Sequence, residues 1–171
     1  NPPAGSETPR GDVTPSPDTW TLLNPTSAIS SGGQTMTVGA NGEITVSGAT
    51  NPNTDTYTIT ALNPLSTVTG MRLEVLPGSA SKIGRGGGDA IITEFQADFA
   101  AGGALDSQAK SRVNLTNATA TYEQTGLPAS EAINDFEFNL GGDNDGWAVS
   151  GASAGSNPTA VFPTAAPLTT S

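Results

Sequence analysis

Hydrophobic and polar residues alternate with a period of two over much of this chain. The clearest case is a run in which Met71, Leu73 and Val75 alternate with Arg72 and Glu74. Successive side chains of a β-strand point to opposite faces, so this run predicts a half-buried strand. Its apolar side would face a core and its charged side would face solvent.

Further strand-like segments follow one another at intervals of about ten residues, the spacing expected of an antiparallel sandwich. They comprise residues 20–23, 35–38, 43–46, 56–60, 90–95, 112–115, 118–122, 146–150 and 160–162. Asn41 and Gly42 favour the positive φ angles of a type I′ turn and predict a tight hairpin. The only helix-like window, residues 128–136, is short enough for one turn. The sequence therefore predicts an all-β fold, an antiparallel β-sandwich.

Both ends of the chain differ in composition from its middle. Residues 1–18 hold five prolines and almost no large apolar side chain, which predicts a Pro-rich linker or extended arm. Residues 163–171 read as a Pro/Thr-rich tail, and residues 19–162 form the predicted sandwich module. The alternative is that both ends are ordered edge segments that pack against the sheet.

Composition and charge exclude several classes of function. Sixteen acidic residues against six basic ones give a net charge of −10, whereas nucleic-acid binders gather Lys and Arg on one face. No apolar run approaches the about 20 residues of a membrane span, so we expect no membrane insertion. The absence of Cys and His removes disulfides, thiolate and imidazole chemistry and ordinary zinc sites.

Catalysis by paired carboxylates is not expected either. Glycosidases place two carboxyl groups about 5–10 Å apart and raise the pKa of one of them. The acids of this chain gather in turn-like segments, where pKa values stay low. We therefore predict that the protein is not an enzyme.

The acidic excess suits calcium, which binds carboxylate and carbonyl oxygens. A glycine-flanked loop at residues 141–146 carries alternating short oxygen side chains, but it lacks the spacing and the final Glu of an EF-hand. The alternative is that these side chains cap their own backbone in Asx-turns. The predicted calcium ligands are Glu94, Asn134, Asp135, Asp143 and Asp145.

A second set of residues is predicted to bind an organic ligand. Arg72 and Glu74 share one strand face, where the Arg offers donors to hydroxyls or carboxylates and the Glu accepts; the alternative is a cross-strand ion pair. Arg85 and Asp89 lie in a glycine-rich loop within reach of a ligand, with an unpartnered loop charge as the alternative. Tyr57 completes the set as a rim aromatic, unless it is buried behind a hydrogen-bonded hydroxyl.

The two tryptophans occur in strand-like patterns. Trp20 and Trp147 are therefore predicted to lie in the core, while Tyr122, like Tyr57, is predicted at the rim. Exposed rings matter for sugar binding because a ring face stacks on the apolar face of a pyranose.

Several motifs, taken in order, resemble a module of large planctomycete-type secreted multidomain proteins. They are WTLLNP at 20–25, SGG at 31–33, NG at 41–42, DTY at 55–57, VTGMRLEVLP at 68–77, TEF at 93–95, ATATYEQ at 118–124, AIN at 132–134 and GWAV at 146–149. The resemblance covers residues 19–162 and implies a galactose-binding-domain-like jelly roll. In discoidin-type relatives an Ala-Ile-Asp-Gly loop followed by a Trp lies near calcium. Here residues 132–135 and Trp147 stand in similar order, with residues 136–145 inserted between them.

These observations predict a non-catalytic, extracellular or cell-surface binding module for a polysaccharide or glycan, stabilised by calcium. Scarce Lys with abundant Thr, Ser, Asn and Gly resembles bacterial secreted modules. The alternative is a structural subunit of an extracellular fibre or surface assembly, in which copies of the chain self-assemble by strand addition.

Overall fold

The structure, a computed structural model, describes residues 19–48, 54–77, 90–100, 110–134, 146–149 and 157–169. These ranges fold into short antiparallel strands and one 3₁₀ helix, so the predicted all-β, sandwich-like architecture is confirmed. The elements are β1 (Pro25–Ser30), β2 (Thr35–Val38), β3 (Ile44–Ser47), β4 (Tyr57–Ala61), β5 (Thr67–Glu74), β6 (Ala90–Ile92), β7 (Asp98–Phe99), β8 (Ser111–Arg112), β9 (Thr119–Ala120), η1 (Ala129–Ile133), β10 (Trp147–Val149) and β11 (Thr159–Thr169). None of the helical structure in these ranges is long and apolar enough to cross a membrane.

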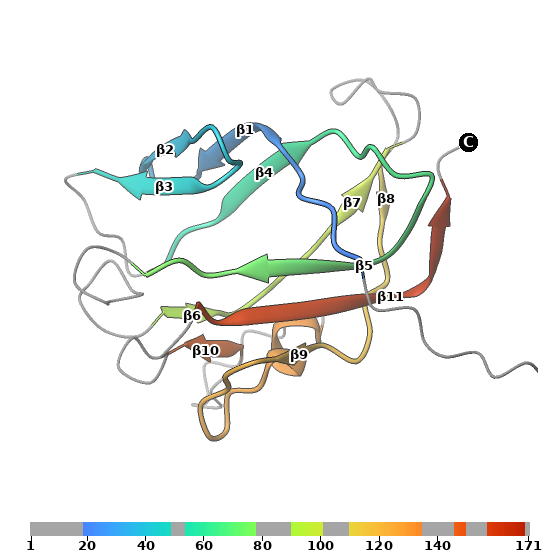
Figure 1. The fold of residues 1–171 in the computed structure, drawn as a ribbon. Helices are drawn as coiled ribbons and strands as arrows, with labels where there is room; N and C mark the ends of the chain where they lie inside the picture. The colour runs from blue at the N-terminus through green and yellow to red at the C-terminus, as the bar shows by residue number, and fades with distance from the viewer. Residues whose placement is uncertain are drawn as a thin grey trace, which may run out of the picture.

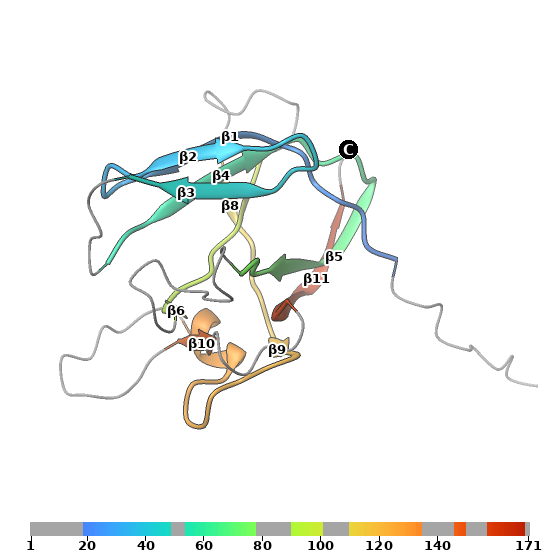
Figure 2. The same cartoon turned by 60° about the vertical axis from the view of Figure 1, so that its left-hand side comes forward.

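The strands form two layers (Figure 1). One layer holds β1 to β4, in which β1 pairs with β4 and β2 pairs with β3. The other holds the sheet β5-β11-β9 and the pair β6–β10, with η1 beside β10. In the second view β8 lies close beneath the β1–β4 layer, and the chain that follows it runs down to β9 (Figure 2).

The β2–β3 hairpin follows its amphipathic sequence closely. Met36 pairs with Val46 and Val38 with Ile44, and these half-buried side chains alternate with exposed Thr and Ser residues. The predicted type I′ turn is wrong, because Gly42 has a φ of +76° whereas Asn41 does not lie in the left-handed region. The Gly42 amide donates to the Gly39 carbonyl at 3.1 Å, so the loop is a turn that ends in a left-handed glycine.

The pattern at Met71–Val75 is realised in β5, which begins earlier, at Thr67, and ends at Glu74. Met71 and Leu73 are half-buried and Arg72 and Glu74 are exposed. β11 lies between β5 and β9 and extends to Thr169, so residues 163–169 of the predicted tail belong to a strand. This agrees with the alternative of an ordered segment at that end.

Several strand boundaries differ from the prediction. Residues 20–23 do not form the predicted strand; the first strand, β1, begins two residues later, at Pro25. β6 ends at Ile92, three residues earlier than expected, and Leu115 forms an isolated bridge with Thr164 outside β8. In the described part of the helix-like window, residues 128–134, the chain forms the five-residue 3₁₀ helix η1, in line with the single turn that was predicted.

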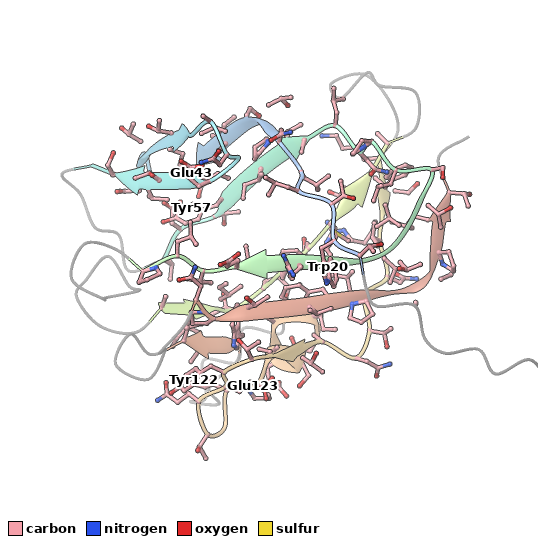
Figure 3. The ribbon with its side chains drawn as sticks, in the orientation of Figure 1. Trp20, Glu43, Tyr57, Tyr122 and Glu123 are labelled. Carbon is pink, nitrogen blue, oxygen red and sulfur yellow. The ribbon has the colours of Figure 1, made fainter. Side chains whose placement is uncertain are left out.

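The core lies between the β5-β11-β9 sheet and the pair β6–β10. Its fully buried members include Trp147 and Phe162, both 0% exposed, so the predicted burial of Trp147 is confirmed. The Phe162 ring stacks on Phe95 with centroids 3.9 Å apart. Tyr122 and Glu123, labelled in Figure 3, hold the edge of this core. The Trp147 indole Nε1 donates to the Tyr122 carbonyl at 2.8 Å, and Glu123 Oε1 accepts from the first amide of η1 at 2.9 Å.

Candidate functional site

The charged side of β5 forms the outer face of the β5-β11-β9 sheet, opposite the core. Arg72 lies directly across from Val161 on β11, and Glu74 lies across from Thr159. The pair between them, Leu73 on β5 and Ala160 on β11, packs in the core. Because side chains alternate along a strand, Arg72 and Glu74 must project to the other side. The predicted shared face of these two residues is therefore present.

Trp20 lies on this outer face. The segment at residues 19–24 crosses in front of β5 in Figure 1, and Trp20 is labelled beside β5 in Figure 3. The Arg72 guanidinium carbon lies 5.2 Å from the centroid of the Trp20 ring, a cation–π arrangement. Trp20 is 37% exposed, so its predicted core position is wrong. Its apolar run mimics a strand, but the run lies outside the sheet that it crosses.

Glu74 is held by a residue from a distant part of the chain. The Asn157 amide nitrogen donates to Glu74 Oε1 at 2.6 Å, across a separation of 83 residues. The predicted alternative, a cross-strand ion pair made by Arg72 and Glu74, is wrong because their cross-strand neighbours are uncharged. We call Trp20, Arg72, Glu74 and Asn157 the outer-face cluster. Sequence reasoning missed Asn157, since no local pattern links it to β5.

The other predicted ligand-binding residues are not part of this cluster. Tyr57 opens β4 in the other layer, pairs with Ser30 and is 44% exposed. Its ring is thus accessible, as predicted for a rim residue, but Figure 3 places it away from Trp20. Arg85 and Asp89 lie outside the described residues.

The predicted calcium ligands are only partly described. Glu94 follows β6, and the amide of the next residue, Phe95, donates to the Ala132 carbonyl of η1 at 2.7 Å. Asn134 directly follows η1 and its amide nitrogen donates to Glu131 at 3.0 Å. Glu94 and Asn134 therefore belong to segments whose backbones are hydrogen-bonded to each other.

The remaining predicted ligands, Asp135, Asp143 and Asp145, lie outside the described ranges. Within those ranges no three or more acidic, His or Cys side chains converge as a metal site. The calcium site stays a prediction.

Asp55 is a carboxylate that sequence reasoning missed. It accepts hydrogen bonds from the Ser30 hydroxyl at 2.5 Å, the Gly32 amide at 2.7 Å and the Ser31 hydroxyl at 3.1 Å. These bonds tie the start of β4 to the turn after β1. The Ser30 hydrogen bond is the largest cause that lowers the pKa of Asp55 below its ordinary 3.8, and the Gly32 and Ser31 bonds act in the same direction against partial desolvation.

We expect the Asp55→Asn variant to lose a pH-dependent part of the stability. The pKa is lower in the folded state, so the charged carboxylate stabilises the fold above pH 3.8, and this contribution disappears as the pH falls through the folded value. The variant should melt below the wild type at about pH 6, and the gap should shrink below pH 3.8. Melting curves across that range test this; a gap that stays constant at all pH values would contradict it.

Comparison with known proteins adds no assignment to this geometry. No family model, no curated protein and no solved structure matches the chain.

Proposed function

We propose that this chain is a non-catalytic carbohydrate-binding module whose binding surface is the outer-face cluster. The observation that carries the proposal is the half-exposed Trp20 ring beside Arg72, on the same face as the Glu74–Asn157 pair. An accessible indole with donors and acceptors around it is what a sugar requires, because a pyranose has apolar faces and a hydroxyl-bearing rim.

The spacing of the polar groups supports this proposal. Arg72 and Glu74 are two residues apart on one strand, which separates them by roughly 6.5–7 Å, about the scale of a sugar unit. Asn157 already engages one oxygen of Glu74, which fixes the direction of the carboxylate. A ligand hydroxyl would then meet an oriented acceptor at one end and guanidinium donors at the other.

The scaffold also favours binding rather than turnover. Arg72 and Glu74 of the cluster lie on a hydrogen-bonded strand whose inward residue Leu73 packs in the core with Trp147 and Phe162, so the backbone that carries them is fixed before a ligand arrives. Such preorganisation lowers the entropic cost of binding. An extracellular setting and a calcium ion held by Glu94, Asn134 and the loop acids are part of the same proposal.

Affinity electrophoresis in gels that contain soluble polysaccharides tests this function. We expect the wild type to be retarded and Trp20→Ala to bind about tenfold more weakly or worse, the loss that accompanies about 1.4 kcal/mol. Leu22→Ala is the matched control, because Leu22 is exposed in the same segment and should be dispensable. Parallel gels with calcium and with chelator measure any dependence on the metal.

Two outcomes of these gels would contradict the proposed surface. One is equal retardation of Trp20→Ala and the wild type. The other is an absence of retardation of the wild type in every polysaccharide, with and without calcium.

One observation favours a second candidate, a structural subunit joined by strand addition. Ile29 on β1 and Ile59 on β4 are 61% and 49% exposed, and within the described residues each of these strands pairs with only one other. Open strand edges with apolar neighbours favour pairing with another chain. Electron microscopy and sedimentation velocity of the protein used in the gels decide the question: filaments would support this candidate and a strict monomer would exclude it.

A further inference from the structure

Arg72 faces no acidic side chain across its sheet. Its cross-strand neighbour on β11 is Val161, and the next residue in that row, on β9, is Thr119. The ion pair that occurs in the described residues joins Arg112 to Asp98 at 2.7 Å, on β8 and β7. In a chain with a net charge of −10, Arg72 is thus a cation without a described carboxylate partner.

The nearest acid along the strand is otherwise engaged. Glu74 shares the face of Arg72, but its Oε1 accepts from Asn157, which precedes β11. Arg72 instead places its guanidinium over the Trp20 ring. Within the described residues, the contacts that β5 makes on this side therefore leave the Arg72 guanidinium without a direct carboxylate contact.

The contact with the indole leaves donors of the Arg72 guanidinium available. Its five N–H groups lie in the plane of the guanidinium and point outward in several directions, so contact with one ring cannot engage all of them. The fork matches the two oxygens of a carboxylate in a bidentate pair, which is stronger than hydrogen bonds between neutral groups. Arg72 is exposed, so an external carboxylate can reach it.

From these contacts we infer that the outer-face cluster prefers acidic polysaccharides and that Arg72 binds the carboxylate of a uronic acid residue. The inference rests on the proposed function and names its ligand class. Trp20 then contacts the apolar part of the sugar chain, while Glu74 and Asn157 face its hydroxyls. The overall negative charge opposes a polyanion, but at 0.15 M salt the Debye length is about 8 Å, so distant charges are screened more than a direct contact.

Polygalacturonate and its fully methyl-esterified form provide the matched ligands, because they share one backbone and differ in charge. Affinity electrophoresis of the whole chain, with chelator present so that no divalent ion bridges protein and polymer, should show about tenfold tighter binding to the acid form. Arg72→Lys keeps the charge but loses the fork, and we expect it to lose most of this preference. Arg112→Lys is the control and should keep it, since Arg112 is paired with Asp98.

The possible outcomes separate the inference from the proposed function. Equal retardation by the two polymers, or an unchanged preference in Arg72→Lys, would overturn the uronate inference and leave sugar binding intact. No retardation by either polymer also overturns the inference, and if other polysaccharides fail as well, the proposed function fails with it. Melting curves of each variant confirm that the fold is retained.

Discussion

Replacing Trp147 with alanine is expected to lower the free energy of unfolding by about 3–5 kcal/mol. The side chain is fully buried in β10, among alanines of η1 and next to β11, so its removal leaves a cavity in the described core. It also removes the donor to the Tyr122 carbonyl. A domain of this size has about 5–15 kcal/mol of stability in total, so the variant should be near unfolding. Urea denaturation measures the loss.

The second tryptophan supplies the control for this variant. Trp20→Ala removes the same side chain from the outer face, where it is partly exposed, and should cost roughly 1 kcal/mol or less. Trp147→Phe retains an aromatic ring in the core but leaves the Tyr122 carbonyl without its indole donor. Its loss of unfolding free energy should therefore lie between those of Trp147→Ala and Trp20→Ala. Equal losses in Trp147→Ala and Trp20→Ala would mean that the core is not centred on β10.

Gly146→Ala should be the other strongly destabilising change, by about 3 kcal/mol or more. A Cβ at Gly146 would lie 2.6 Å from the Ile92 carbonyl oxygen and 2.7 Å from the Thr93 Cα. Both are backbone atoms at the end of β6. Because β10 begins directly after Gly146 and pairs with β6, neither atom can move away without disturbing that strand pair. The glycine also has a φ of +118°, which strains any other residue.

Gly126→Ala separates the two causes. Gly126 has a φ of +81°, but a Cβ there meets nothing within 4 Å, so this variant carries only the conformational cost, about 1 kcal/mol. Thermal unfolding of both variants therefore measures the steric part as their difference. If the two proteins melt at the same temperature, the close approach of β6 to Gly146 is not a determinant of stability.

The elements that could be predicted from the sequence are those in which the order of apolar and polar residues matches which side chains are buried. Met71 to Val75 alternate because one side of β5 faces the core, and Trp147 is apolar among apolar neighbours because β10 is wholly buried. Period-2 alternation reports directly on burial, so such segments need no tertiary information. The all-β class followed from them.

The errors arose where local pattern and tertiary position diverge. Prolines normally argue against a central strand, yet β11 continues through Pro163. A register shift between Pro163 and Leu168 absorbs the irregularity, and the Pro163 carbonyl accepts from the Thr116 amide at 2.9 Å. At Trp20 the apolar run was real, but nothing in it shows that the segment lies across β5 on the outside.

The site was predictable only in part, and for the same reason. Arg72 and Glu74 were found because two residues on one strand must share a face. Their partners were not, since Trp20 reaches Arg72 over 52 positions (72 − 20) and Asn157 reaches Glu74 over 83. Asp55 was likewise missed, because its donors Ser30, Ser31 and Gly32 lie at the end of β1 and in the turn after it, more than twenty residues earlier.

The uneven distribution of buried residues has a dynamic consequence. Every buried hydrophobic side chain in the described ranges lies at or after Val113, and β1 to β4 contribute none. Local opening costs least where few apolar contacts break, so the β1–β4 layer should exchange its amide protons sooner than β10 and β11. The β1–β4 layer can then rearrange around a partner while the core around β10 and β11 stays folded.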